Sequence, residues 1–152
     1  MNVRPDDPIV LRFLHHSFVA RVATQSRSGR PALTPLWFIV DRGHLYMATG
    51  QATLAARNAV ASPEVAILFD GEAAGRSGHV LRVHGRATVH SGLPSWRVLA
   101  RLALKYYVAP PAARVELAHA GKWRLRTRYY AQGQGAVIEV APETAELVRS
   151  PS

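Results

Sequence analysis

The stretch FVARVATQSRSGRPALTPLWFIVDRGHLYMAT, residues 18–49, decides the fold class. Three short segments, 18–24, 31–40 and 44–49, are rich in β-branched and aromatic residues and are separated by SRSGR and DRG, which have turn composition. This pattern predicts a three-stranded meander. The middle segment is apolar on both faces, with Leu33, Trp37 and Ile39 alternating with Leu36, Phe38 and Val40. A strand of this kind belongs inside a barrel or under another layer.

The next stretch, YMATGQATLAARNAVASPEV (46–65), indicates a strand, a glycine-containing turn and a short helix. We expect the helix to begin at Thr53, whose hydroxyl is a good cap, and to stop near Ala61 because the residue before Pro63 resists helical geometry. Residues 64–70 read as a buried strand. Residues 79–90 alternate between apolar side chains on one face and Arg or His on the other, which predicts a strand with one core face and one cationic face.

The remaining segments complete a small barrel. We expect a helix at 6–15, opened by Asp6 or Asp7 with Pro8 in its first turn, and further helices from Pro94 through Tyr106 and from Pro111 to Gly121. Closing strands are expected at 122–130 and 135–142. The predicted fold class is therefore mainly β, a β-barrel with short helices. One domain spans 1–148, with an N-terminal helical segment at 1–16, a helical insertion at 93–121 and a loose tail at 149–152.

The composition of the chain excludes several classes of function. The chain of 152 residues has no cysteine, which excludes cysteine nucleophiles, thiolate metal sites and disulfides. It has no apolar run of membrane-spanning length and no secretory signal pattern, so we expect a soluble cytoplasmic protein without a membrane partner. The net charge is +9, carried mainly by arginine, which suits phosphate or carboxylate partners. The histidines lack metal-ligand spacing, so no metal site is expected.

The order and spacing of three motifs resemble the pyridoxamine 5'-phosphate oxidase-like family of split β-barrels. These motifs are ATQSRSGRPALTPLWFIVDRGHLYMAT, ARNAVASPEVAILFD and VHGRATV. The resemblance covers residues 18–140 and implies an FMN-binding split barrel. It further implies a homodimer that binds FMN, or the deazaflavin coenzyme F-420, in two equivalent clefts between subunits.

Carried over by resemblance, Pro35, Leu36 and Trp37 lie against the flavin or deazaflavin ring. Thr49 and Thr53 contact the phosphate end, and Arg57 and Asn58 follow in the same helix. This agrees with elementary physics, since the free amides at a capped helix start favour an anion. The chain departs from the family at Ala55, where family members commonly place a phosphate-binding lysine.

The segment KWRLRTRYY (122–130) resembles the Arg-Leu-His-Asp-Arg stretch of pyridoxamine phosphate oxidases. Arg128 matches and is assigned to the cofactor. Arg126 replaces the histidine and Thr127 the aspartate, which argues against a vitamin B6 substrate. Arg86, Arg124 and Arg126 form a predicted cationic rim for an anionic substrate. A solvated edge strand explains the same charges equally well.

We therefore expect a flavin-type oxidoreductase that transfers hydride to or from a small, anionic substrate, with the cofactor supplying the redox chemistry. The sequence assigns no catalytic acid or base. Two alternatives stay open: a family member that has lost its cofactor and binds a small ligand as a dimer, for which Ala55 is the best support, and a module binding nucleic acid or another polyanion through its arginines. The latter is the less favoured.

Overall fold

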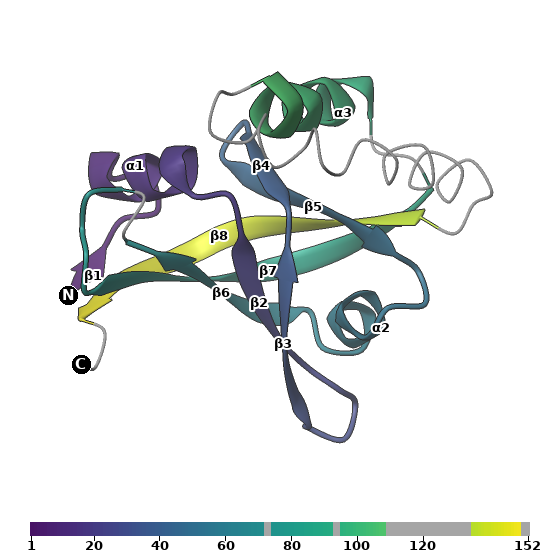
Figure 1. The fold of residues 1–152 in the computed structure, drawn as a ribbon. Coiled ribbons are helices and arrows are strands. Elements are labelled where there is room, and N and C mark those ends of the chain that lie inside the picture. The colour runs from purple at the N-terminus through teal and green to yellow at the C-terminus, as the bar shows by residue number, and fades with distance from the viewer. Residues whose placement is uncertain (72–73, 93–94, 109–134, 150–152) are drawn as a thin grey trace.

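The structure is a computed structural model and describes residues 1–71, 74–92, 95–108 and 135–149. One antiparallel sheet curls into a half-barrel, and short helices lie on its outside (Figure 1). The strands are β1 (Asn2–Val3), β2 (Ala20–Gln25), β3 (Pro31–Leu36), β4 (Phe38–Asp41), β5 (His44–Gly50), β6 (Glu64–Asp70), β7 (His79–Ser91) and β8 (Gly135–Arg149). The helices are α1 (Pro8–His16), α2 (Leu54–Ala61), α3 (Trp96–Ala103) and a π-helical turn, η1 (Leu104–Val108). The predicted fold class, a mainly β barrel with short helices, is confirmed.

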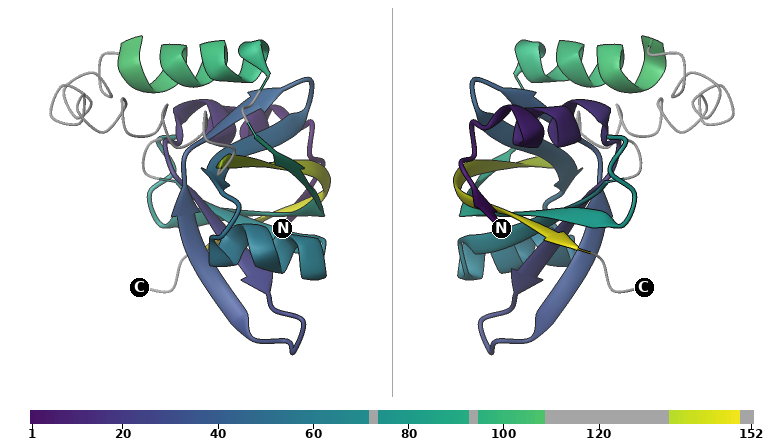
Figure 2. Two further views of the ribbon diagram at one scale, coloured as in Figure 1. Left: turned by 90° about the vertical axis from the view of Figure 1, so that its right-hand side faces the viewer. Right: turned by 90° about the vertical axis from the view of Figure 1, so that its left-hand side faces the viewer.

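The sheet is curled so far that one stretch of chain, residues 31–40, contributes a strand to each of its two ends. The strand order is β3-β2-β6-β7-β8-β5-β4, with β1 added alongside β8. The sequence pattern predicts a single strand over 31–40 in a three-stranded meander, and this prediction is wrong. The segment breaks at Trp37 into β3, which pairs with β2, and β4, which pairs with β5 at the opposite end of the sheet. Figure 2 shows the sheet turning back on itself between these two ends.

The side chains of residues 36–40 point alternately to the two faces of the sheet, as predicted, and each face is covered there by other parts of the protein. Phe38 is buried in the main core, and Leu36 and Val40 pack against that core. Ile39 and Trp37 belong to a second apolar cluster on the other face. Leu33 shares this second face but is 57% exposed, because α3 covers only the β4–β5 end of the sheet.

The two longest strands, β7 and β8, pair from one end to the other. The predicted alternation of β7 is confirmed, since Leu81, Val83 and Ala87 are buried and the intervening side chains face outward. Gly85 lies at a register shift where a Cβ atom would stand 2.5 Å from the carbonyl oxygen of Ala141. The glycine of the VHGRATV motif is therefore required by the close approach of the two backbones.

Strand β8 is longer than the sequence predicted. The expected strand ended at residue 142, whereas β8 continues to Arg149, which pairs with His79. Arg149 was assigned to a loose tail and in fact ends the sheet. The run is hard to recognise because Pro142 and Glu143 interrupt its apolar pattern at the register shift.

Helix α1 is capped as the sequence predicts, whereas α3 begins two residues later than predicted. Asp7 caps α1 with Pro8 in its first turn, and Phe13 and its neighbours Val10 and Leu14 fill the core. The predicted helix starting at Pro94 begins instead at Trp96 with Ser95 as its cap, and its last turn widens into η1. The predicted helix 111–121 and strand 122–130 lie outside the described residues.

An ion-pair cluster attaches α3 to the sheet. Asp41, at the end of β4, is buried and lies 3.1 Å from Arg97 and 3.4 Å from Arg101. The hydrogen bond from Arg97 and the charges of both guanidinium groups lower the pKa of the Asp41 carboxyl. The position of α3 over β4 and β5 is therefore set by charge as well as by the second apolar cluster.

Candidate functional site

The start of α2 is the place where the predicted cofactor residues come closest together. Strand β5 ends at Gly50, a short turn follows, and Thr53 caps the helix as predicted. The Thr53 hydroxyl lies 2.8 Å from the carbonyl oxygen of Gly50, 3.0 Å from the Thr49 hydroxyl and 3.3 Å from the amide nitrogen of Ala56. The turn is thus closed by the hydroxyl groups of Thr49 and Thr53.

The single hydroxyl proton of Thr53 fixes the direction of these bonds. It is donated to the Gly50 carbonyl, so Thr53 accepts from the amide of Ala56 and from the Thr49 hydroxyl. The backbone amides of Leu54 and Ala55 have no acceptor among the described residues. These two amides, at the positive end of the helix, are therefore the groups best prepared to meet an anion.

The side chains of α2 divide between the site and the core. Arg57 is exposed and lies one turn after Thr53 on the same face. Asn58 is 4% exposed, and its amide donates to the Thr24 hydroxyl of β2 at 3.1 Å, so this side chain ties the helix to the sheet. Ala55 is 1% exposed and part of the main core. Ala55 therefore contributes to core packing. It also lacks the amine of the lysine that family members commonly have at this position.

The predicted ring-binding residues lie beside this turn. Strand β3, which carries Pro35 and Leu36, contacts both β5 and α2. Pro35 is exposed and Leu36 packs against the core. Trp37 faces the other way, where its indole stacks on the ring of Tyr106 with centroids 4.5 Å apart and planes 8° from parallel. One face of the indole is therefore already occupied.

Tyr106 and Lys105 hold this aromatic cluster together, and the sequence did not single out either as a site residue. The Tyr106 hydroxyl donates to the Phe18 carbonyl at 2.6 Å and accepts from the Phe38 amide at 3.0 Å. The Lys105 ammonium lies 3.5 Å from the centre of the Phe38 ring and donates to the Phe38 carbonyl at 3.2 Å. Burial lowers the pKa of Lys105 from 10.5 to about 7. No sequence pattern marks these contacts, because the partners are more than sixty residues apart.

The predicted substrate residue Arg86 is not close to the start of α2. It pairs with Glu64 at 3.2 Å on the outer face of the sheet, beside the C-terminal end of α2 and about 12 Å along the helix from Thr53. On the same face Arg82 pairs with Glu146, and His90 lies 3.3 Å from Glu139. Acids from β6 and β8 therefore neutralise much of the face that the sequence predicted to be cationic.

The other predicted site residues, Arg124, Arg126 and Arg128, lie outside the described residues, so their roles stay predictions. Within the described ranges no group of three His, Cys, Asp or Glu side chains could hold a metal ion. None of the helices described is both long and apolar enough to cross a membrane. The start of α2 is thus the best-formed anion site among the predicted residues that the structure describes.

A curled antiparallel half-barrel with short outer helices is the fold of split β-barrel proteins, and the sequence matches a specific family of them. The model of the pyridoxamine 5'-phosphate oxidase family matches residues 7–149, and the chain belongs to this family. No protein of curated function matches the sequence.

Several solved structures share the fold. An F420 reductase superimposes with a TM-score of 0.62 at 20% identity, over 88% of this chain and 93% of its own. The haem storage protein HutZ from Vibrio cholerae superimposes with a TM-score of 0.62 at 16% identity, over 97% of this chain and 95% of its own. General stress protein 26 from Bacillus anthracis superimposes with a TM-score of 0.54 at 16% identity, over 93% of this chain and 95% of its own. At these identities the similarity establishes the fold, and the different descriptions show that the fold serves more than one role.

Proposed function

We propose that this protein is a flavin-type oxidoreductase that binds FMN, or alternatively coenzyme F-420, with the phosphate end of the cofactor at the start of α2. The observation that carries the proposal is that the amides of Leu54 and Ala55, beside the Thr49 and Thr53 hydroxyls, have no acceptor in the part of the chain that the structure describes. Membership of the family supports the cofactor class. The likeness to an F420 reductase supports F-420 as the alternative.

The residues present fit a phosphate-bearing group. Two amides and the helix dipole favour a dianion, and Arg57 provides a guanidinium on the same helical face as Thr53. The Thr49 hydroxyl can turn from Thr53 to a ligand oxygen without leaving a buried donor unpaired. The side chain of Asn58 is committed to Thr24 and contributes packing and alignment of the helix instead.

The cofactor would supply hydride transfer, and this chain would bind it, orient it and keep water from one side. Pro35 and Leu36 would lie along the ring, while the stacked pair of Trp37 and Tyr106 fixes the bend between β3 and β4. We further propose a homodimer whose second subunit completes the cleft, with Arg128 at the cofactor and Arg124 and Arg126 toward an anionic substrate. The Glu64 pair makes Arg86 a weaker candidate for that role.

The cofactor class is tested by absorption spectroscopy of the purified protein during titration with FMN and with F-420. Saturable binding of either one supports the proposal and chooses between them. Because the fold neighbours include a haem storage protein, the same titration is repeated with haemin. Saturation by haemin, with no binding of FMN or F-420, would contradict the proposal.

The position of the phosphate is tested by comparing FMN with riboflavin, which lacks that group. In the wild type FMN should bind more tightly than riboflavin, and Arg57→Met should reduce this preference about tenfold, the value of one charge-assisted contact. Arg76→Met, at an exposed arginine of the β6–β7 connection, is the matched control and should leave the preference unchanged. An unchanged preference in Arg57→Met would move the phosphate away from α2.

A further inference from the structure

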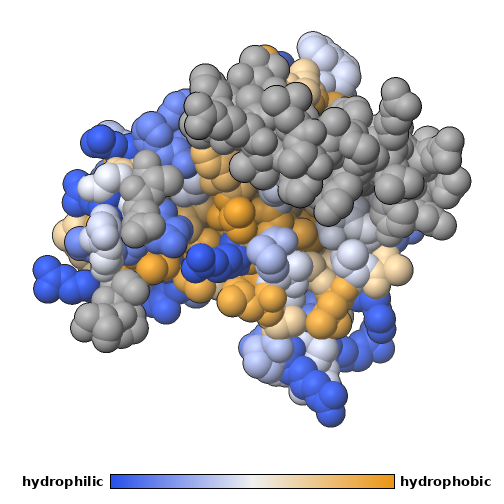
Figure 3. All heavy atoms as spheres, in the orientation of Figure 1, coloured by the Kyte–Doolittle hydropathy of each residue, from blue (hydrophilic) through white to orange (hydrophobic). Residues whose placement is uncertain are grey.

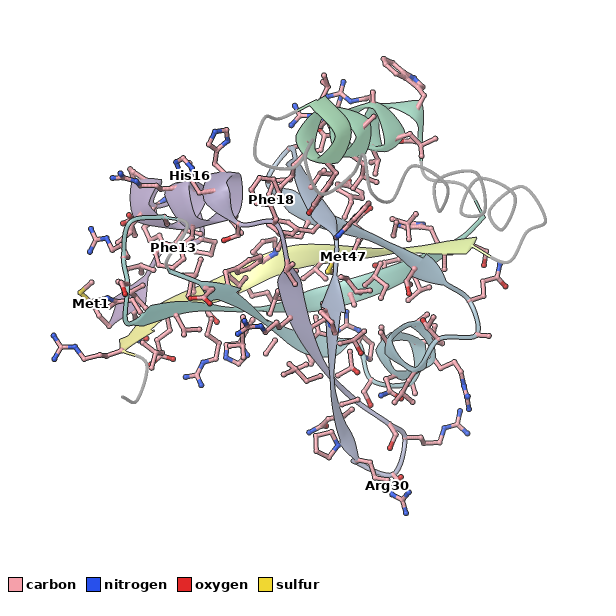
Figure 4. The ribbon with its side chains drawn as sticks, viewed as in Figure 1. Met1, Phe13, His16, Phe18, Arg30 and Met47 are labelled. Carbon is pink, nitrogen blue, oxygen red and sulfur yellow. The ribbon has the colours of Figure 1, made fainter. Side chains whose placement is uncertain are left out.

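A second possible ligand site lies between α1 and α3, away from the start of α2. This α1–α3 groove has a volume of about 1090 Å³ and is bounded by α1, the segment before β2, β4 and the end of α3 with η1. None of the predicted cofactor or substrate residues that the structure describes lines it. In Figure 3 apolar atoms gather in the middle of this face, and Figure 4 labels His16 on α1 and Phe18 between the two helices.

The floor of the groove is apolar and mostly aliphatic. Its apolar side chains are Leu11, Leu14, Phe18, Ile39, Val40 and Leu104. Leu11 is 49% exposed and Leu104 is 61% exposed, although both lie beside buried apolar neighbours. Large apolar side chains gathered in an open hollow lose water-exposed area when a ligand with an aliphatic body covers them.

Among the described residues the rim of the groove is entirely basic. The ionisable side chains that line it are Arg12, His15, His16, Arg101 and Lys105, and no carboxylate of the described residues lines the groove. Arg12, His15 and His16 follow one stripe of α1 and have no acidic partner among the residues described. Arg101 is held by Asp41 and by the Val40 carbonyl, which fixes it at the edge of β4.

Lys105 lies where the basic rim meets the apolar floor. Its ammonium contacts the Phe38 ring and the Phe38 carbonyl, and no carboxylate of the described residues pairs with it. Taking an ammonium out of water without an anion is costly, and the lowered pKa of Lys105 reflects this cost. An anion placed in the groove would reduce that cost.

We propose that the α1–α3 groove binds an amphipathic carboxylate, with its aliphatic body on the floor at Leu11 and Leu104 and its carboxylate against the basic rim at Lys105. Charge complementarity selects the sign of the head group, and the aliphatic floor selects the body. This site is separate from the cofactor site at α2. It does not depend on the function proposed above.

The test is isothermal titration calorimetry of the whole chain with decanoate. Decanol keeps the body without the charge, acetate keeps the charge without the body, and decyltrimethylammonium reverses the charge. We expect saturable binding of decanoate and at least about tenfold weaker binding of the other three probes. Equal affinity for decyltrimethylammonium would indicate non-specific apolar adsorption and would overturn the proposal.

Paired variants locate the site. Leu104→Ser and Lys105→Met should each weaken decanoate binding about tenfold. The controls are Val60→Ser, an apolar side chain 68% exposed on α2, and Arg27→Met in the β2–β3 turn, and neither should change the affinity. Thr53→Val should also bind decanoate normally, because it alters only the α2 site. Wild-type affinity in both groove variants would place binding elsewhere.

A measurement on the wild type keeps the test decisive if a groove variant fails to fold. The ring protons of His15 and His16 are followed by NMR during addition of decanoate and of acetate. Decanoate should shift these signals and acetate should not. Unshifted signals at saturating decanoate would overturn the assignment of the groove.

Discussion

Whether a side chain is buried or exposed decides its role in and around α2. The sequence places Ala55, Arg57 and Asn58 together on one short helix, and the resemblance assigned Arg57 and Asn58 to the cofactor. The structure separates them, since Arg57 is exposed while Ala55 and Asn58 face the sheet. Within a helix each residue turns about 100° from the last, so neighbours in sequence often serve different surroundings.

Asn58 should stabilise the fold through its bond to Thr24. Asn58→Ala leaves the buried Thr24 hydroxyl without its partner, so the free energy of unfolding should fall by about 1 to 3 kcal/mol. A double-mutant cycle with Thr24→Val, measured by urea unfolding, should give a coupling energy of about 0.5 kcal/mol or more. Strict additivity of the two substitutions would show that the bond contributes nothing.

Lys105 should make stability depend on pH above neutrality. Its pKa falls from 10.5 to about 7 on folding, so between these values the unfolded chain binds more protons than the folded one. Stability should therefore rise with pH across this window, and Lys105→Met should lack that rise. The urea unfolding free energy of the wild type, relative to the variant, should increase by about 1 to 2 kcal/mol from about pH 7.5 to about pH 9.5. A difference that stays constant with pH would contradict the lowered pKa.

At the scale of elements, local signals and tertiary contacts decide different things. The caps of α1 and α2 and the alternation of β7 follow from neighbouring residues, and these predictions hold. The division of residues 31–40 into β3 and β4 does not follow from neighbouring residues, because both halves have the same apolar pattern. It depends on strand pairing, since the first half pairs with β2 and the second with β5 at the opposite end of the sheet.

The β4–β5 turn carries a measurable strain. Arg42 and Gly43 form its two central residues, with φ angles of 52° and 78°. A left-handed conformation is costly for arginine and much less so for asparagine, so Arg42→Asn should stabilise the protein by about 0.5 to 1 kcal/mol. Thermal unfolding measures this, with Arg30→Asn in the β2–β3 turn as the control expected to change little. A lower melting temperature for Arg42→Asn would indicate that the Arg42 side chain makes a stabilising contact.

At the scale of the whole molecule, the sheet leaves one apolar edge uncovered. Strand β3 pairs on one side only among the described strands, and its outward residues Pro31, Leu33 and Pro35 are exposed. Proline on an edge strand removes backbone donors and discourages further strand pairing. Association through side chains on this face is therefore more favourable than extension of the sheet.

If the protein is the proposed homodimer, Leu33 belongs to the surface where the subunits meet. Leu33→Glu should shift the mass measured by light scattering after size exclusion from dimer to monomer, because a charge buried in an apolar interface is costly. Val60→Glu changes an even more exposed apolar residue on α2 and should remain dimeric. A Leu33→Glu protein that is still dimeric would place the interface on another face.

The sequence by itself determined the fold class, the helix caps, the alternation of β7 and the family, because these depend on residues within a few positions of each other or on motifs in a fixed order. Only the tertiary structure decided that 31–40 closes the sheet from both ends, that β8 runs to Arg149, and that Glu64 and Glu146 neutralise the arginines of β7. It also decided that Asn58 serves the core and that Lys105 lies over Phe38. Each of these depends on a contact between residues that are distant in sequence, for which no local pattern exists.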